Sequence, residues 1–501
     1  MQRALALSLA LTACIGGCYR SHERAPDGSL VDASMSRDGG SDGGRDAAPL
    51  DAGPPELTTC DVGRDTIEPR AVWATTLVRS FDDLGSAELP EVQALPSGGV
   101  IVATAALGRA VILRRINERD AGDLFCVIAR YDAGGELLWR RELDGCTVID
   151  LGVAADDSIC VLGSFREGAD LGGGPVAGNG LYALSMSGDG AMRGVHTVRG
   201  SGGNALDIAC DAEGTVVVGA GRGDDALSID ERRVLPPSTD GGGWVARWDA
   251  SGALVWAQAV DGVAAAVAIA ADGSVRSAEH GAALEDGALA ARVRSMRQGD
   301  GSTFELRTSA LRPLRGETAS LTIDELELTE RGHWLTGRFR GELELGEGVR
   351  ARSEGALENG FVIHAPDVGV PAVATLRSSS SPLYLNLSAL GDAQAIVAGA
   401  YRGEGSFAGL SSRASVGTDV FVLGVGADGA AMWLRTFADE PSARARPYVE
   451  DDERWRAPAD VSARSDDEIY VAGRFLSRIV LGDCALTGEE MNSFLARLSA
   501  R

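Results

Sequence analysis

The sequence predicts an all-β protein, and three observations indicate a β-propeller of seven four-stranded blades. A two-strand phrase with an Asp- and Gly-containing turn and a final Trp occurs at 127–139, 244–256 and 421–433. A second phrase, two short strands around a tight turn, occurs seven times at a spacing of about 60 residues. Half-copies of the first phrase stand near the two ends, at 70–81 and 494–501. Four short strands per repeat, joined mostly by hairpins, are typical of a propeller blade.

The second phrase sets the count of seven. Each unit reads strand A, a tight turn, strand B, a longer connection, strand C, the Asp/Gly turn and strand D. Residues 461–465 and 468–475 illustrate strands A and B, and residues 244–249 and 253–260 illustrate strands C and D. The residue near the end of strand B is a glycine in five copies and Thr or Ser in two: Gly163, Gly219, Gly337, Gly399, Gly473, Thr104 and Ser277.

The two half-copies predict how the array closes. Residues 494–501 supply strand C of the last unit, and residues 70–81 supply its strand D. Pairing these N- and C-terminal strands closes the propeller and leaves no free sheet edge between the first and last blades. The tryptophans that end the first phrase are expected to pack between blades rather than to bind a ligand: Trp73, Trp139, Trp256 and Trp433.

The amino terminus is typical of an exported lipoprotein. Residues 1–18 have one early positive charge, Arg3, and an apolar run at 4–13, too short to span a bilayer. The segment ending at Cys14 resembles the bacterial lipobox, and Cys18 follows a looser match. We expect a lipid anchor on Cys14, with Cys18 as the alternative, and a location in the cell envelope as an outer-membrane or cell-surface lipoprotein. Ordinary secretory cleavage stays open, as do the membrane and the leaflet.

Residues 19–65 are rich in Gly, Asp and Pro and have almost no large apolar side chain to bury. We therefore expect a disordered tether, followed by the propeller at 66–501. The net charge of −25 and the pI near 4.6 repel phosphate backbones, so no nucleic-acid partner is expected.

The cysteines from Cys60 onward should tend to oxidise in an exported protein. A Cys60–Cys484 bridge across the closure is the preferred pairing, and Cys126–Cys146, flanking one hairpin, is the second. Free buried thiols are the alternative for each pair.

No catalytic motif is present, the five histidines are scattered, and no metal, cofactor or catalytic residue is predicted. The longer connections are all D–A or B–C, which emerge on one face of a propeller, and variable loops on a rigid scaffold often bind ligands. The insertion at 438–458 gives the binding-face candidates, with a mobile acidic loop as the alternative: Tyr448, Asp451, Asp452, Arg454, Trp455 and Arg456.

Two resemblances add to this interpretation. The stretch SFREGADLGGGPVAGNG from Ser164, followed by LYALSMSGDG, resembles the seven-bladed propeller repeats of bacterial extracellular proteins, common in myxobacteria. This resemblance covers 66–501 and implies the fold but no ligand. ARWDASGALVW also resembles the tryptophan motif of quinoprotein propellers. It departs from that motif in having two residues rather than three between Asp249 and Gly252, and two rather than one between Ala246 and Asp249. Quinoprotein propellers generally have eight blades, so a quinone cofactor is not expected.

The expected function is a lipid-anchored, exported, non-catalytic propeller that acts as a monomeric binding or scaffold module for a protein or glycan at the cell envelope. The alternative is a propeller enzyme, either a quinoprotein-like oxidoreductase or a lyase or hydrolase acting on an extracellular polymer.

Overall fold

The computed structural model describes residues 58–59 and 70–499, with gaps of which the widest are 60–69, 81–85, 118–123, 284–288, 305–311, 315–319 and 438–458. Residues 52–501 belong to one compact unit. Every regular element of the described residues is a β-strand, as the alternating sequence pattern predicts. Within that part of the chain there is no helix with the length and hydropathy needed to cross a bilayer.

The strands form seven consecutive antiparallel meanders, here called repeats 1–7, each with strands A, B, C and D in that order. The members are repeat 1 (β4 Glu91–Ala94, β5 Val100–Leu107, β8 Leu124–Tyr131, β9 Leu137–Cys146), repeat 2 (β10 Asp150–Val153, β11 Ile159–Asp170, β12 Gly180–Met186, β13 Met192–Arg199), repeat 3 (β14 Ser201–Cys210, β15 Val216–Arg222, β18 Gly243–Trp248, β19 Leu254–Val260), repeat 4 (β20 Val263–Ile269, β21 Val275–Ala283, β22 Leu289–Met296, β23 Thr303–Phe304), repeat 5 (β25 Ser320–Thr329, β26 Gly332–Arg340, β29 Asn359–Pro366, β30 Ala372–Ser378), repeat 6 (β31 Tyr384–Leu390, β32 Gln394–Gly403, β35 Ser415–Gly426, β36 Ala431–Phe437) and repeat 7 (β37 Asp460–Ser465, β38 Glu468–Phe475, β41 Asn492–Ser499, β2 Arg70–Ser80).

The C–D turn shows why the chain reverses where it does. In repeat 3, Oδ1 of Asp249 accepts the backbone N–H groups of Ser251 and Ala253 at 2.9 and 3.0 Å. Gly252 has a φ of +78°, a conformation that costs a side-chain-bearing residue energy. An Asp at the start of the turn and a Gly near its end therefore fix this hairpin.

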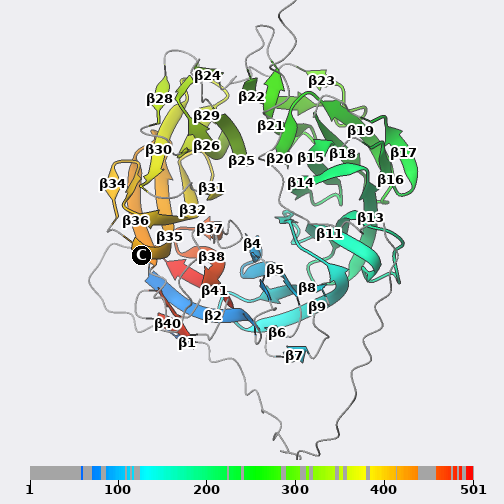
Figure 1. Ribbon diagram of the computed structural model, residues 1–501, viewed down its shortest axis with the longest axis horizontal. Coiled ribbons are helices and arrows are strands. Elements are labelled where there is room, and N and C mark those ends of the chain that lie inside the picture. Colours follow the sequence, from blue (N-terminus) through cyan, green and yellow to red (C-terminus); the bar gives the residue numbers. More distant parts are fainter. Residues whose placement is uncertain are drawn as a thin grey trace, which may run out of the picture. The chain divides into compact units, whose positions relative to one another are not determined.

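The predicted pairing of the two terminal strands is confirmed. Blue β2 lies beside red β41 (Figure 1), in antiparallel register from Arg70 opposite Ser499 to Arg79 opposite Asn492. Two residues of the segment expected to be tether also belong to this sheet. Thr58 and Thr59 form β1, which pairs with Ala74 and Trp73 of β2.

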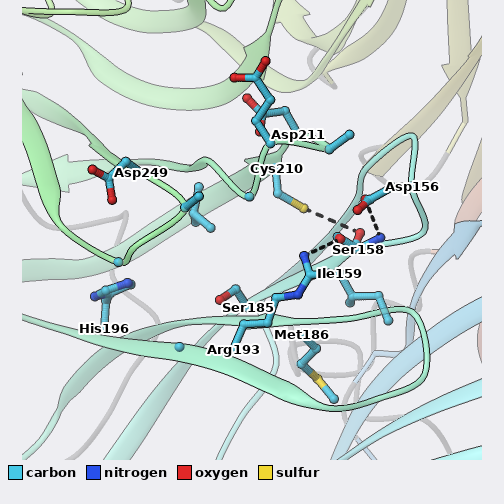
Figure 2. A pocket seen from close by; sticks show the side chains of 17 residues that line it. Asp156, Ser158, Ile159, Ser185, Met186, Arg193, His196, Cys210, Asp211 and Asp249 are labelled. Carbon is cyan, nitrogen blue, oxygen red and sulfur yellow. Dashed lines mark hydrogen bonds between the residues drawn. The ribbon is translucent and has the colours of Figure 1, made fainter.

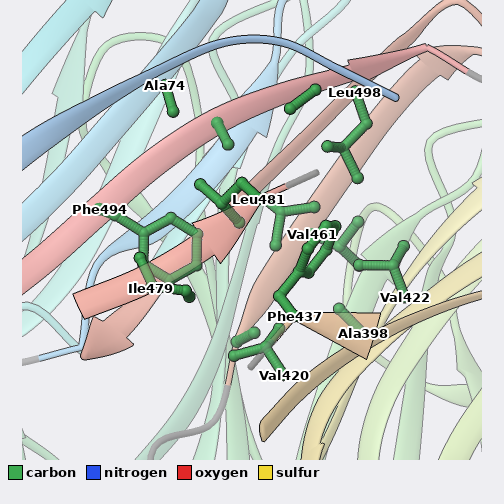
Figure 3. Close-up of a cluster of buried hydrophobic side chains, with 14 of the residues drawn as sticks. Ala74, Ala398, Val420, Val422, Phe437, Val461, Ile479, Leu481, Phe494 and Leu498 are labelled. Carbon is green, nitrogen blue, oxygen red and sulfur yellow. The ribbon is translucent and has the colours of Figure 1, made fainter. Parts of the chain in front are cut away.

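Buried hydrophobic side chains of the described residues form seven clusters, and each cluster is shared by two consecutive repeats. The cluster between repeats 6 and 7 contains Ala74 of the N-terminal strand β2 together with Phe494 and Leu498 of β41 (Figure 3). Another joins repeat 7 to repeat 1 through Trp73 and Tyr470. Strand A of each repeat contacts strand A of the next, and β37 contacts β4. The last repeat thus packs against the first as any repeat packs against its neighbour.

Several B–C connections form hairpins that extend the preceding repeat. β6 (Ala110–Ile112) and β7 (Arg115–Asn117) of repeat 1 add to β2 of repeat 7. β16 (Leu227–Ile229) and β17 (Arg232–Leu235) of repeat 3 add to β13 of repeat 2, and β33 (Gly405–Phe407) and β34 (Leu410–Ser411) of repeat 6 add to β30 of repeat 5. We call such a hairpin an arm. The arms tie neighbouring repeats together along their outer strands.

Besides β1, the strands outside the A–D meanders and these arms are β3 (Ser86–Ala87), β24 (Arg312–Leu314), β27 (Glu342–Glu344), β28 (Arg350–Arg352), β39 (Arg478–Leu481) and β40 (Cys484–Thr487).

Candidate functional site

The strand-D tryptophans join neighbouring repeats. The indole Nε1–H of Trp73 donates to Ala133 O, that of Trp139 to Gly188 O and that of Trp256 to Gln298 O, each at 3.0 Å. In each case the acceptor is the second residue of the C–D turn in the following repeat. The prediction that these tryptophans pack between repeats is therefore confirmed at three interfaces.

Repeat 2 departs from this rule. Trp139 and Trp256 stand opposite the penultimate residue of strand C, Arg130 and Arg247 respectively. In repeat 2 the penultimate residue of strand C is Ser185, and the residue opposite it in strand D is Gly194. The interface between repeats 2 and 3 therefore has a glycine where its neighbours have an indole.

A cavity of about 220 Å³ lies at this interface (Figure 2). We call it the interface cavity. Its apolar part comprises Ile159, Met186 and Val216, all of which are buried. Repeat 2 supplies one side from its A–B turn and its strands B, C and D. Repeat 3 supplies the other from its A–B and C–D turns and the adjoining ends of its strands A and B. The cavity thus lies where Gly194 stands in place of the indole found at the two neighbouring interfaces.

His196 is the most constrained polar side chain of the cavity. Its Nδ1 lies 3.0 Å from Oδ2 of Asp230, and Oδ1 of Asp230 accepts the backbone N–H of Thr197 at 2.9 Å. Its ring stacks on Trp248 of repeat 3, with centroids 5.1 Å apart, and the residue is only 8% exposed. Asp230 comes from the arm of repeat 3, between β16 and β17. Repeat 3 therefore orients a histidine that belongs to repeat 2.

Hydrogen bonds also fix the ionisation of Asp230. Burial alone would raise the pKa of this carboxyl, but the hydrogen bonds from His196 and Thr197 outweigh burial and lower the pKa. Asp230 is therefore a carboxylate at neutral pH, and the Nδ1 edge of His196 faces a negative charge. The opposite edge of the ring, which carries Nε2, is left for the cavity.

Carboxylates from the turns give the cavity an acidic lining: Asp156, Asp211, Glu213 and Asp249. Oδ1 of Asp156 accepts Ser158 N–H, and Oδ1 of Asp211 accepts Thr215 N–H, so the turns hold these groups in place. Hydrogen bonds from Ser251 and the neighbouring backbone lower the pKa of Asp249.

For Asp156, partial burial opposes ionisation, but the hydrogen bonds from Ser158 prevail and lower the pKa. Arg193 is the cationic side chain in the lining, and its Nη1 donates to Ser158 Oγ at 2.7 Å. The four carboxylates outnumber it, so the cavity favours cationic groups over anionic ones.

The described residues contain no group of three or more His, Cys, Asp or Glu side chains that could hold a metal ion.

A second acidic group lies along the A strands. Asp460 Oδ2 accepts Val92 N–H of repeat 1, and Asp150 Oδ2 accepts Ile208 N–H of repeat 3 at 2.7 Å. Asp207 and Glu327 accept N–H groups of Val267 and Ala389 in the same manner, each from the next repeat. We call these carboxyls and their neighbours Glu91 and Glu325 the inner carboxyls. Those that accept N–H groups satisfy backbone donors on strand A, which have no further strand to pair with.

The inner carboxyls also repel one another. Burial raises the pKa of Asp460 and of Glu327 to about 7. Burial, and then repulsion from carboxylates of other repeats, raises the pKa of Glu91, Asp207 and Glu325 well above the ordinary range. The inner carboxyls serve the packing of repeats, and we assign them no ligand.

The sequence-predicted site residues fall mostly outside the described residues. This holds for the lipidation candidates Cys14 and Cys18, for Cys60, and for all binding-face candidates of the insertion (Tyr448, Asp451, Asp452, Arg454, Trp455 and Arg456). The interface cavity lies at the end of the repeats where the A–B and C–D turns gather, the end opposite to the D–A and B–C connections on which we expected binding.

Two disulfides join described cysteines. Cys126 is bonded to Cys146, the second of the two pairings considered from the sequence. Cys160 is bonded to Cys210, a pairing not anticipated, which links strand B of repeat 2 to strand A of repeat 3 beside the interface cavity. Cys484 is also disulfide-bonded.

Sequence reasoning missed Gly194, Ser185, His196 and Asp230. A signal for Gly194 was present, because the first phrase aligns across the repeats and in repeat 2 it reads Met192-Arg193-Gly194 where the tryptophan is due. No comparable signal marked Asp230, whose position depends on the arm of repeat 3.

No protein-family profile and no curated protein matches the chain. A protein of unknown function from Dyadobacter fermentans aligns over 87% of this chain and 100% of its own, with 11% identity and a TM-score of 0.41. One of unknown function from Bacteroides caccae covers 62% of this chain and 89% of its own, with 9% identity and a TM-score of 0.30. A mutant of the Synechocystis apocarotenoid oxygenase covers 51% of this chain and 57% of its own, with 13% identity and a TM-score of 0.28. Likenesses this distant assign neither a family nor an activity.

Proposed function

We propose that the chain is a seven-bladed β-propeller, exported and lipid-anchored, that acts as a monomeric, non-catalytic binding or scaffold module at the cell envelope. Each repeat has the four-stranded meander of a blade, and the strand D of repeat 7 comes from the N-terminal side of the chain. The seven shared hydrophobic clusters and the contacts between successive A strands support a cyclic arrangement.

The interface cavity is the observation that carries the binding role. The interfaces on either side are filled by the indoles of Trp139 and Trp256, whereas Gly194 leaves about 220 Å³ open between repeats 2 and 3. A concave site with an apolar wall and a few fixed polar groups is the usual form of a ligand site. The partner is a protein or glycan component of the envelope that inserts one side group there.

The location rests on the amino-terminal sequence. A short apolar run ending at Cys14, followed by a polar segment rich in Gly and Asp, supports an outer-membrane or cell-surface lipoprotein. A tethered module of this kind can reach partners beyond the bilayer to which its lipid is bound.

A photo-cross-linking residue placed at Glu213 in the full-length protein tests the binding role in living cells. Glu213 lies on the A–B turn of repeat 3 and lines the cavity, whereas Asp272 lies at the matching place on the A–B turn of repeat 4. We expect a discrete envelope adduct from position 213 and none from position 272. Equal adducts from both positions, or none from position 213, would contradict the proposed site.

One observation favours a second candidate, a hydrolase acting on an extracellular polymer. A Cβ at Gly194 would stand 3.3 Å from Ser185 Oγ and 3.8 Å from His196 Nε2, so a hydroxyl and an Asp-oriented imidazole face the same small space. Such a set can activate a nucleophile. Hydrolysis of ester-bearing polysaccharides that disappears in both Ser185→Ala and His196→Ala would establish this activity, and absence of turnover in the wild type would exclude it.

A further inference from the structure

The two neighbouring interfaces show which kind of group fits the space that Gly194 leaves between repeats 2 and 3. At each, an indole lies against a glycine of the next C–D turn. A Cβ at Gly190 would stand 3.0 Å from Cδ2 of Trp139, and a Cβ at Gly301 would stand 2.8 Å from Cδ2 of Trp256. The indole edge then donates its N–H to the second residue of the same turn. A flat ring and one N–H donor therefore fill this place.

The C–D turn of repeat 3 also has the glycine and the carbonyl group that contact an indole at the neighbouring interfaces. Gly252, with its φ of +78°, is the C–D turn glycine, and Ala250 is the second residue of that turn, corresponding to Gly188 and Gln298. None of the hydrogen bonds among the described residues ends on Ala250 O. The carbonyl that accepts an indole N–H elsewhere is present here without the indole.

The imidazole of His196 covers only part of the C–D turn surface that an indole covers at the neighbouring interfaces. A Cβ at Gly252 would stand 3.2 Å from His196 Cε1, so the imidazole touches the turn glycine from one side. The hydrogen bond to Asp230 and the stacking on Trp248 hold the ring there. The remaining space has Ile159 and Met186 on its apolar side, and an apolar engineered cavity of roughly 150 Å³ suffices for a benzene ring.

The charge of the side chains that line the cavity further restricts the class of ligand that can bind. Asp249 and Asp156 are ionised at neutral pH, and Glu213 and Asp211 add two more carboxylates around the same opening. A negative substituent would be repelled, whereas an ammonium group would gain one or more charge-assisted hydrogen bonds.

We infer that the interface cavity binds a flat aromatic group that has a ring N–H and carries a cationic substituent, seated where the strand-D indole lies at the two neighbouring interfaces. This inference rests on the binding function proposed above and names the ligand class of that site. The ring lies against Gly252 and Gly194, the ring N–H donates to Ala250 O, and the cation meets the turn carboxylates.

Three probes that differ in charge test the inference on the full-length protein by calorimetric titration. Tryptamine carries a positive charge, indole none and indole-3-acetate a negative charge. We expect saturable 1:1 binding of tryptamine, weaker binding of indole, and indole-3-acetate weaker than tryptamine by roughly fivefold or more, the scale of one exposed charge pair. No saturable binding of tryptamine, or equal binding of all three probes, would overturn the inference.

Variants at Gly194 locate the site. Gly194→Trp introduces the side chain that repeats 1 and 3 have at this place, Trp139 and Trp256, so it should abolish tryptamine binding and raise the thermal unfolding midpoint. Gly194→Ala, which adds one methyl near Ser185 Oγ, should weaken binding while leaving the fold intact. Gly173→Ala is the control, because a Cβ there meets nothing within 4 Å. Tryptamine affinity unchanged in both Gly194 variants would place the binding elsewhere and overturn the inference.

The charge contribution is tested separately by Glu213→Gln, which should weaken tryptamine severalfold and leave indole unchanged. A specific envelope adduct at position 213 combined with failure of tryptamine to bind would refute this ligand class and leave the binding function standing. No envelope adduct at position 213 together with no binding of tryptamine would refute both the binding function and the ligand class.

Discussion

The indole Nε1–H of Trp256 donates to the carbonyl oxygen of Gln298 at 3.0 Å, joining strand D of repeat 3 to the C–D turn of repeat 4. Trp256 is 6% exposed and belongs to the hydrophobic cluster shared by these two repeats. The same relationship links Trp139 to Gly188 one interface earlier in the sequence. The interface between repeats 2 and 3, with Gly194 at the matching place, lacks this relationship.

Trp256→Ala should lower the free energy of unfolding by about 3–5 kcal/mol, because it removes a large buried side chain and leaves a cavity. Val255 is the control, since it is the adjacent residue on the same strand but is 39% exposed. Val255→Ala should change stability by about 0.5 kcal/mol or less. Denaturant unfolding of the two variants gives both values, and equal losses would mean that the indole does not hold this interface.

The regular part of this architecture could be predicted from the sequence. Each repeat presents the same two phrases, and the half-copies at 70–81 and 494–501 predicted the pairing of β2 with β41. The arms escaped prediction because their strands are only two to four residues long, too short for a clear alternating pattern. The Cys160–Cys210 bond escaped it because the two cysteines meet only after two repeats have packed together. The interface cavity depends on an absent side chain, which a search for motifs overlooks.

The inner carboxyls make stability depend on pH in the direction opposite to the usual one. The pKa values of Glu91, Asp207, Glu325, Glu327 and Asp460 are raised in the folded protein, to about 7 for Asp460 and Glu327, so the folded state binds more protons than the unfolded chain between pH 4 and pH 7. Their stabilising contribution is complete below the unfolded pKa values near 4 and is lost as the pH rises through 7. The unfolding midpoint should therefore fall between pH 5 and pH 8.

The double variant Asp460→Asn/Glu327→Gln should flatten this dependence, because the amides do not titrate. Thermal unfolding at several pH values between 5 and 8 compares the two proteins at constant ionic strength. A wild-type midpoint that rises over this range would show that the inner carboxyls do not take up protons on folding.

The Cys160–Cys210 disulfide closes a loop with a sequence separation of 50 residues between repeats 2 and 3. Cys160→Ser/Cys210→Ser should cost about 3–4 kcal/mol, through greater freedom of the unfolded chain. The Cys126–Cys146 pair, with a separation of 20, should cost less when replaced in the same way. Denaturant unfolding measures both losses. A Cys160/Cys210 variant as stable as the wild type would mean that the bond does not stabilise this interface.

The lipid anchor is tested by labelling cells with palmitate. Cys14→Ser should abolish incorporation if Cys14 is the modified residue, and Cys18→Ser should do so if the second match is used. The double variant should carry no label and should leave the membrane fraction. Full labelling of the double variant would end the lipoprotein interpretation.

The closed arrangement of seven repeats is the central claim, and one comparison of thermal unfolding midpoints tests it most directly. Removing residues 493–501 takes away nearly all of β41, the partner of both β38 and β2, so Trp73 loses Leu495 from their shared hydrophobic cluster. We predict aggregation or a large fall in the unfolding midpoint for this truncation, and an unchanged midpoint when residues 19–57 are removed. A C-terminal truncation as stable and monodisperse as the full-length protein would contradict the closed arrangement.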